Sequence, residues 1–342
     1  MRRFILFLLG IICWSTFFAS CEKDEDLSLE EKKKITIVVD TILNRDTIII
    51  HNDSTNTNDT IIKTDTIINQ ETVVSIDERV LLLDFDTLSY ENIIVEKAFV
   101  IEKKVGTSLQ GIAVFNDLLF QTHNYGSYID VYDLTNNTFA FSIEKNRENS
   151  VHCNNADFGP YYASDDPFPL LYLEHSSGKH QTSVYRIIKQ ESIYTMEKVQ
   201  TLNFSQCTNA ITNNDNNNGF MYVSYTHDNI RSIAKINIPD ISLENHTVAL
   251  DSINILDQFD IVIDKVAQDA TVYNNKLFQL KGYSGEGEIC IYDLIKHKII
   301  FVIDWNRVGM AGEPEGIAWY KDHLIVTTNS RQVYNIYFAK NL

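Results

Sequence analysis

Five polar residues stand at equivalent points of a phrase that recurs along the chain. The phrase is clearest as LQGIAVF at 109–115 and EPEGIAW at 313–319. In each copy a polar residue comes directly before a glycine or alanine, at Gln110, Asn155, Asn209, Asp269 and Glu315. If the copies surround one axis, two carboxylates and three amides meet there and could bind a cation, a sugar or a peptide end. The structural alternative is that these side chains bond only channel water and neighbouring backbone.

Three carboxylates are candidates for catalysis. Asp269 and Glu315, together with Asp157, could supply the acid and the base or nucleophile of a glycoside hydrolase or lyase. The sequence lacks GxSxG, HExxH and GxxxxGKS/T, the motifs of a serine hydrolase, a zinc protease and a nucleotide site. No motif fixes the distance between the carboxyl groups, so an enzymatic role stays open and a non-catalytic role is favoured.

The sequence predicts no cofactor. The run NNDNNNG at 213–219 is similar to a calcium loop, but with Gly219 at the sixth position the twelfth falls on Tyr225 instead of a glutamate. The polar side chains therefore leave calcium binding possible, but no motif supports it. Three cysteines, Cys153, Cys207 and Cys290, lack CxxC spacing, so we expect buried free thiols and neither a zinc site nor a disulfide framework.

Short β-strands must position these polar residues. The small residues that follow them, Gly111, Ala156, Ala210, Ala270 and Gly316, are separated by 45, 54, 60 and 46 positions. Aromatic and β-branched runs such as YIDVYDL at 128–134 fill each interval, which is typical of propeller blades. The last unit ends without an outer strand, and residues 93–103 can complete it and close a ring. We predict an all-β, five-bladed β-propeller. Residues 78–88 could instead begin a sixth blade, or pack on the ring as a latch.

The start of the chain has the pattern of an export signal. Basic Arg2 and Arg3 precede the apolar run 4–14, and small Ala19 and Ser20 precede Cys21. This resembles a bacterial lipobox, which implies a signal peptide over 1–20, a lipid on Cys21 and an outer-membrane anchor. The acidic run CEKDED that follows resembles a surface-export tag of Gram-negative lipoproteins and implies that the protein faces the cell exterior. An ordinary secretory signal or an uncleaved anchor is the alternative.

Residues 21–77 form a predicted stalk rich in Thr, Asn and Asp. The tripeptide Asp-Thr-Ile occurs in it four times and resembles a bacterial O-glycosylation sequon, which implies glycans on Thr41, Thr47, Thr60 and Thr66. Sugars would keep such a stalk soluble and extended. The alternative is a β-prone edge segment or a weak coiled coil. The domain at 78–342 follows, closed by strand 93–103.

The composition of the chain argues against some classes of binding partner. The formal net charge of -17 argues against binding nucleic acid or docking on anionic lipid by charge alone. The blade pattern over 93–342 resembles bacterial surface lipoproteins with YVTN/NHL-like β-propellers, a resemblance that implies a fold and not a reaction. Our interpretation is a monomeric, lipid-anchored binding module for a glycan or protein partner. The alternatives are the hydrolase or lyase above and an accessory subunit of an outer-membrane complex.

Overall fold

The computed structural model describes residues 35–42, 45–52, 73–74, 85–102, 108–124, 128–144, 152–175, 181–204, 208–228, 230–241, 247–250, 254–262 and 265–339. The chain separates into two compact units, Met1–Glu78 and Arg79–Leu342. The predicted signal peptide, Cys21, Thr60 and Thr66 lie outside the described residues. Among the helices within these ranges, none is long and apolar enough to span a membrane.

The first unit contains a small antiparallel sheet in the predicted stalk. Its strands are β1 (Ile35–Ile42), β2 (Arg45–Asn52) and β3 (Val73–Val74), in the order β2-β1-β3. The first two Asp-Thr-Ile copies face each other here, with Asp40 opposite Thr47 and Thr41 opposite Asp46. Residues 35–52 therefore form a paired hairpin, because Ile, Val and Thr fit the pleated backbone of a strand.

The second unit is all-β and built from antiparallel meanders. Three sheets have four strands each. The first contains β13 (Thr208–Asp215), β14 (Phe220–His227), β15 (Ile230–Asn237) and β17 (Asp257–Ile261). The second contains β18 (Ala267–Tyr273), β19 (Lys276–Lys281), β20 (Glu288–Asp293) and β21 (Lys298–Asp304). The third contains β22 (Pro314–Tyr320), β23 (His323–Thr328), β24 (Gln332–Phe338) and β4 (Ile93–Val100).

A nine-stranded sheet holds the remaining strands. One meander contains β5 (Leu109–Phe115), β6 (Leu118–His123), β7 (Tyr128–Asp133) and β8 (Thr138–Glu144). The other contains β9 (Ala156–Phe158), β10 (Leu171–His175), β11 (Gln181–Gln190) and β12 (Ile193–Phe204). Outer strands β8 and β12 join them by a short parallel contact, and β16 (Thr247–Leu250) adds to β12.

The closing strand pairs as its position in the sequence predicts. β4 lies antiparallel to β24, from Ile93 opposite Phe338 to Val100 opposite Gln332. Asn92 extends this pairing, because its backbone and its side chain both bond to the backbone of Ala339. A strand from the beginning of the domain therefore supplies the outer edge of the last sheet.

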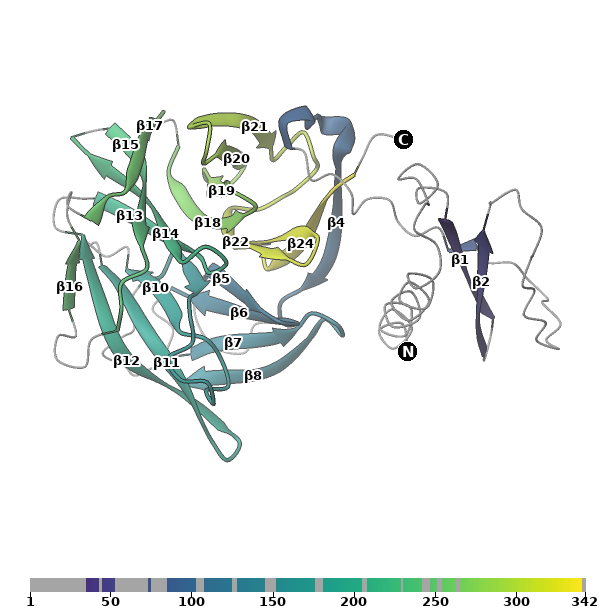
Figure 1. The fold of residues 1–342 in the computed structure, drawn as a ribbon, viewed down its shortest axis with the longest axis horizontal. Coiled ribbons are helices and arrows are strands. Elements are labelled where there is room, and N and C mark those ends of the chain that lie inside the picture. Colours follow the sequence, from purple (N-terminus) through teal and green to yellow (C-terminus); the bar gives the residue numbers. More distant parts are fainter. Residues whose placement is uncertain are drawn as a thin grey trace, which may run out of the picture. The chain divides into compact units, whose positions relative to one another are not determined.

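The first strands of the meanders touch one another in a closed cycle. β5 contacts β9, β9 contacts β13, β13 contacts β18, β18 contacts β22, and β22 returns to β5. Figure 1 shows β5, β18 and β22 in the middle of the domain and β4, β8, β12, β17 and β21 toward its edge. This arrangement of sheets around a common axis is of the β-propeller type.

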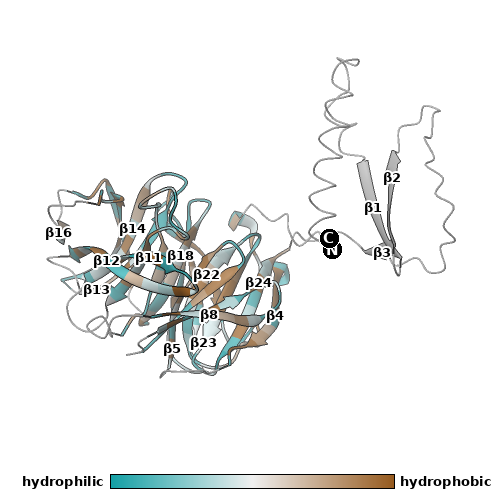
Figure 2. Cartoon of the chain, turned by 90° about the horizontal axis from the view of Figure 1, so that it is seen from below, coloured by the Kyte–Doolittle hydropathy of each residue, from teal (hydrophilic) through white to brown (hydrophobic). Residues whose placement is uncertain are grey.

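Hydrophobic side chains fill the spaces between adjacent sheets. Brown and teal segments alternate along the strands in Figure 2, as expected when each strand presents successive side chains to different surroundings. One cluster joins Phe278 and Trp305 of one sheet region to Tyr334 and Phe338 of the next. Burying one such aromatic side chain contributes on the order of 1.5–3 kcal/mol.

The segment before the closing strand packs against this cluster. Residues 85–87 and 90–92 form two 3-10 turns, η3 (Phe85–Thr87) and η4 (Tyr90–Asn92). The Phe85 ring lies edge-on to Phe278 at 5.4 Å and to Phe338 at 5.2 Å. The described part of 78–88, residues 85–88, is therefore a turn that packs on the ring.

Candidate functional site

Four of the five predicted polar residues meet in pairs near the starts of the inner strands. Gln110 Nε2 donates to Glu315 Oε2 at 3.0 Å, and Asn155 Nδ2 donates to Asp269 Oδ1 at 2.6 Å. The side chain of Asn209, the fifth, lies outside the described part of the chain. Four of the predicted polar residues are thus brought together in two pairs, one between neighbouring inner strands and one between β18 and the start of β9.

Small residues permit this close approach. A Cβ added at Gly111 would lie 2.5 Å from the Asn154 carbonyl oxygen. One added at Gly316 would lie 2.9 Å from the backbone nitrogen of Ile112. A side chain at either position would push the inner strands apart, which explains the glycine at 111 and 316.

Asp269 is fully buried and bonded on every side. Its Oδ1 accepts from Asn155 Nδ2 and the Ala270 backbone N–H, and its Oδ2 accepts from the backbone N–H groups of Ile112 and Ile317. Burial raises the pKa of the carboxyl, and these four donors oppose that shift. Asp269 connects several inner strands, as the structural alternative expects, and its role as a ligand-binding or catalytic residue stays a prediction.

Glu315 and Gln110 form a buried pair at the same end of the ring. Only 6% of Glu315 is exposed, and burial, with a smaller contribution from Glu313, raises its pKa to about 8. Gln110 also donates to the Leu109 carbonyl oxygen at 2.7 Å. The pair can hold or release a proton near neutral pH.

A pocket of about 430 Å³ lies at the opposite ends of the same inner strands. Each inner strand contributes to it, through Val114 and Phe115 of β5, Asp157 and Phe158 of β9, Asn214 and Asp215 of β13, Thr271 and Val272 of β18, and Trp319 of β22. Asp157 is the predicted site residue that lines it. Gln110, Asn155, Asp269 and Glu315 come earlier in their strands or just before them and do not line this pocket.

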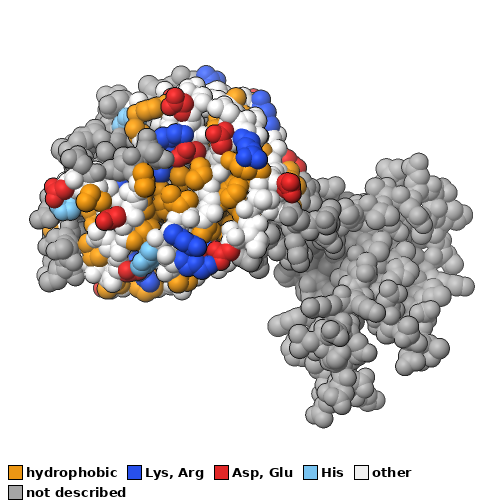
Figure 3. Space-filling view, turned by 90° about the horizontal axis from the view of Figure 1, so that it is seen from above, with side chains coloured by type: hydrophobic (Ala, Val, Ile, Leu, Met, Phe, Trp, Pro, Cys, Tyr) orange, Lys and Arg blue, Asp and Glu red, His pale blue; other side chains and the backbone are white. Residues whose placement is uncertain are grey.

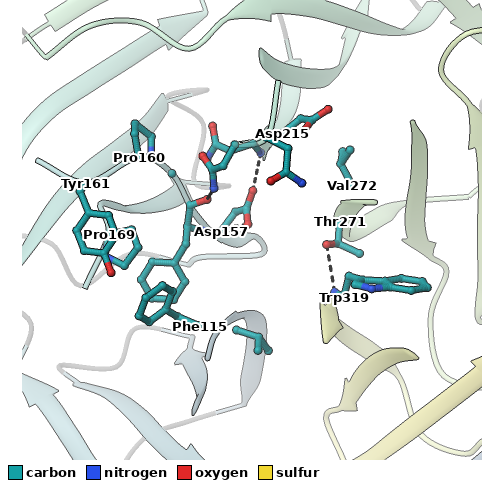
Figure 4. Close-up of a pocket in the computed structure, with 15 residues that line it drawn as sticks. Phe115, Asp157, Pro160, Tyr161, Pro169, Asp215, Thr271, Val272 and Trp319 are labelled. Carbon is teal, nitrogen blue, oxygen red and sulfur yellow. Dashed lines mark hydrogen bonds between the residues drawn. The ribbon is translucent and has the colours of Figure 1, made fainter. Parts of the chain in front are cut away.

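Figure 4 shows these side chains arranged around the cavity, with Phe115 and Asp157 on one side and Thr271 and Trp319 on the other. Two carboxylates, amides and aromatic rings share the wall. Among the described residues that line this cavity, none is a lysine, arginine or histidine. Such a wall suits a ligand with both polar groups and an apolar face.

Asp157 holds β9 to β13 and faces the pocket. Its Oδ2 accepts the Asn214 backbone N–H at 2.5 Å, and its Oδ1 accepts the Phe158 backbone N–H at 2.9 Å. The residue keeps some exposure, but protein surrounds most of the carboxyl, and this burial raises its pKa to about 7. Each oxygen retains a lone pair that a ligand could use.

Asn214 has the most unusual environment in the pocket. Only 7% of the residue is exposed, and neither Oδ1 nor Nδ2 of its carboxamide has a hydrogen-bond partner. A buried polar group left unpaired costs about 1–3 kcal/mol, a cost that a matching donor and acceptor would remove. Sequence reasoning missed Asn214, because the run at 213–219 was judged only as a calcium loop.

The residues after Asn214 form the hairpin turn between β13 and β14. Gly219 adopts a φ of 74°, and Asn218 donates through Nδ2 to Asp215 Oδ2 at 2.8 Å. Asn216 Nδ2 reaches the Phe158 carbonyl oxygen at 2.8 Å. This turn therefore serves as one wall of the pocket.

Trp319 is held rigidly on the opposite wall. Its ring stacks on Tyr273 with centroids 3.9 Å apart, and its indole N–H donates to the Lys321 carbonyl oxygen at 3.0 Å. Its backbone N–H donates to Thr271 Oγ1, a bond drawn in Figure 4. The ring also packs on Phe85 and Phe338 of the core cluster, and this packing fixes Trp319 at the pocket wall.

The sequence predicted buried free thiols and no metal site, and left calcium open. Cys153 and Cys290 are buried and form no disulfide, as expected, whereas Cys207 lies outside the described residues. Within the described ranges, no group of three or more His, Cys, Asp or Glu side chains is placed to hold a metal ion.

Comparisons with known proteins give fold neighbours and no family. No protein family matches the sequence. No curated protein matches it either. The PQQ-bound aldose sugar dehydrogenase of Streptomyces coelicolor is 11% identical, with a TM-score of 0.45 over 72% of this chain and 98% of its own.

Two further solved structures give similar values. Glutaminyl cyclase of Myxococcus xanthus is 9% identical, with a TM-score of 0.47 over 73% of this chain and 98% of its own. The Cps50 (Swd1) β-propeller domain of Myceliophteria thermophila is 11% identical, with a TM-score of 0.41 over 72% of this chain and 100% of its own. At these values the likenesses carry no argument about the activity, cofactor or ligand of this chain.

Proposed function

We propose that this protein is a lipid-anchored, cell-surface β-propeller that binds a glycan in the pocket at the ends of its inner strands. The observation that carries the proposal is the buried Asn214 carboxamide, which lines an open pocket and has no hydrogen-bond partner. Binding proteins place a few oriented polar groups among apolar walls in this way.

The proposal includes five blades. The cycle of contacts among β5, β9, β13, β18 and β22 supports this number, as does the turn formed by 85–88. The parallel contact between β8 and β12 is then a bridge between the outer strands of two neighbouring blades.

Anchoring rests on the lipobox-like sequence before Cys21. Replacing Cys21 with Ser should abolish incorporation of labelled fatty acid and release the protein from the membrane fraction. Protease accessibility in intact cells tests whether the anchored protein faces outward. Complete protection of the native chain in intact cells would contradict surface exposure.

Catalysis is the second candidate, because two carboxylates line the pocket and the pKa of Asp157 is raised to about 7. A carboxyl with such a pKa can serve as an acid or a base near neutral pH. A hydrolase would release products from a bound glycan, and Asp157→Asn would abolish that release.

The full chain should be applied to a glycan array and then incubated with each bound glycan. We expect binding without released products, and we expect Asn214→Ala to remove the binding. Asn306→Ala changes an exposed asparagine on another turn and serves as the control. Absence of any glycan binding by the folded native chain would overturn the proposal.

A further inference from the structure

We infer that Tyr161 forms a second binding subsite at the rim of the pocket, where its ring stacks on the second sugar unit of a glycan whose end unit lies in the pocket. This inference rests on the proposed function and narrows its ligand class to chains of at least two units that bind by one end. Three features support it, namely the construction of the rim, the exposure of Tyr161 and the filled far end of the channel.

Two long connections build the rim of the pocket. Three of the inner strands turn directly into the next strand, at 116–117, 274–275 and 321–322. The connection after β13 is longer, at 216–219, and the connection after β9 is the longest, at 159–170. Among the described residues that line the pocket, those from such connections all belong to these two longer ones. Insertions on the ring therefore shape the pocket, as expected of a binding site carried by a rigid scaffold.

The loop at 159–170 is held firmly to the blade. Arg186 of β11 donates from Nε and Nη2 to Asp166 Oδ1, at 2.8 and 2.6 Å, and the Asp166 side chain is only 4% exposed. Asp166 Oδ2 also accepts the Ala163 backbone N–H at 3.1 Å, and Phe168 packs in a hydrophobic cluster of the core. A loop that is already ordered loses little conformational freedom when it binds a ligand.

Tyr161 presents an exposed aromatic ring on this loop. The residue is 48% exposed, and among the described exposed large hydrophobic side chains it is the one that lines the pocket. Its ring meets that of Phe115, another lining residue, edge to face with centroids 6.1 Å apart. The adjacent Tyr162 differs, because the Arg186 guanidinium lies over its ring at 4.9 Å. Tyr161 therefore extends the aromatic wall from the pocket to the surface.

Figure 4 shows Tyr161 beside Pro160 and Pro169, on the opposite side of the cavity from Trp319. Two prolines restrict the backbone on which the tyrosine stands, since each ring fixes φ. The aromatic ring thus lies at a fixed place on the rim.

The far end of the channel is filled, so a glycan cannot thread through the ring. Asn155 Nδ2 and Asp269 Oδ1 are 2.6 Å apart there, and Asp269 Oδ2 accepts from the backbone N–H groups of Ile112 and Ile317. A chain in the pocket must therefore place an end unit inside, and its next unit must cross the rim.

A tyrosine ring suits that second unit. The C–H face of a sugar can pack on the aromatic face while the phenol hydroxyl stays in water. Tyrosine supplies such contact area with little loss of side-chain freedom. Asn217 is exposed and lines the pocket from the other long connection, so its carboxamide can bond to sugar hydroxyls. Stacking needs a ring face and no particular charge, so neutral and charged sugars are both included.

Calorimetry on the full chain should compare glycans that differ only in length. The probes are fragments of cellulose, chitin, mannan and galactan with one, two and three units, and the same fragments of any other glycan that binds on the array. In a series that binds, we expect affinity to rise about fivefold or more from one unit to two, and less than about twofold from two to three. Equal affinity for one and two units would overturn the inference and leave glycan binding intact.

Three variants test the assigned residue. Tyr161→Ala should weaken binding of the two-unit fragment about fivefold or more and change binding of the one-unit fragment by less than about twofold. Tyr161→Phe retains the ring and should bind like the native chain. Tyr283→Ala removes a tyrosine that is 54% exposed on another turn and is the control.

The outcomes separate the inference from the proposed function. Native affinity of Tyr161→Ala for the two-unit fragment, or an equal loss for both fragments, would refute the rim subsite. Absence of binding to any glycan by the folded native chain would instead refute the proposed function itself.

Discussion

Asn155 Nδ2 and Asp269 Oδ1 are 2.6 Å apart and join two inner strand regions that are not neighbours in the ring. β9 and β18 are separated by β13, so this bond crosses the axis of the domain. Asp269 also accepts from Ile112 of β5 and Ile317 of β22. One carboxylate therefore links inner strands across the central channel.

Replacing Asp269 with Ala should strongly destabilise the domain. The substitution removes the acceptor of four hydrogen bonds and leaves buried donors unpaired, which we expect to cost about 3–5 kcal/mol of the free energy of unfolding. Urea unfolding measures this. A loss below about 0.5 kcal/mol, the size typical of a surface substitution, would show that the crossing bonds do not stabilise the ring.

Replacing Asn214 with Ala should affect affinity and stability differently. The side chain has no hydrogen-bond partner, so its removal relieves two unpaired buried groups and should leave the stability of the free protein unchanged or increase it by about 1 kcal/mol. Thermal unfolding and glycan affinity should be measured on the same sample. A destabilised variant would indicate that Asn214 supports the turn at 216–219 instead of a ligand.

Affinity for an uncharged sugar should rise as the pH increases through about 7. Burial raises the pKa of Asp157 to about 7, and its ionised form is the better acceptor for a hydroxyl group. Asp215 lines the same pocket, and Tyr172 of β10 lies opposite Asp157, but a tyrosine with a raised pKa stays neutral in this range. Calorimetric titrations between pH 6 and 8 measure the trend, which Asp157→Asn should remove.

Glu174 should make the domain more stable at pH 5 than at pH 8. The residue is only 3% exposed, and burial raises its pKa from 4.5 to about 8. Between these values the unfolded chain has released the proton and the folded chain retains it, so stability falls as the pH rises. Urea unfolding across this range should show a slope that becomes flatter, by about 1–3 kcal/mol in total, in Glu174→Gln.

Phe85→Ala should test the latch. Phe85 is 2% exposed and packs on Phe278, Trp319 and Phe338, so the cavity left behind should cost about 3–5 kcal/mol. Ile193→Ala, at a side chain that is 62% exposed, is the control and should change stability by less than about 0.5 kcal/mol. Equal effects in thermal unfolding would mean that η3 is not part of the folded core.

Hydrophobic side chains also lie on the described surface of the domain. Figure 3 shows hydrophobic side chains gathered among charged ones on one face of the domain. The Phe259 ring stacks on the His297 ring, with centroids 4.8 Å apart. His297 Nε2 also bonds to Asp257 Oδ2 at 2.8 Å. These contacts join β17 to the β20–β21 turn and explain part of the packing between neighbouring sheets.

The sequence by itself determined most of the strands, but the expected outer strand of the third unit, at 247–255, was wrong. Residues 247–250 pair with β12, and 257–261 complete the sheet of β13, β14 and β15. Local alternation, turn residues and the repeated small residue encode each four-strand unit, and the missing last strand indicated that 93–103 pairs with the end of the chain. The same phrase placed Gln110 near Glu315 and Asn155 near Asp269, because residues at equivalent positions of a ring face the same axis.

Only the tertiary structure decided where an open pocket lies. Pattern reasoning could not tell which end of the inner strands is filled, since this depends on side chains from distant strands, such as Asn155 and Asp269, satisfying one another. The surroundings of Asn214 likewise depend on a distant residue, because its backbone N–H bonds to Asp157, 57 positions away in the sequence. Hydrogen-bond satisfaction is a property of the assembled ring, so no periodic pattern in the chain records it.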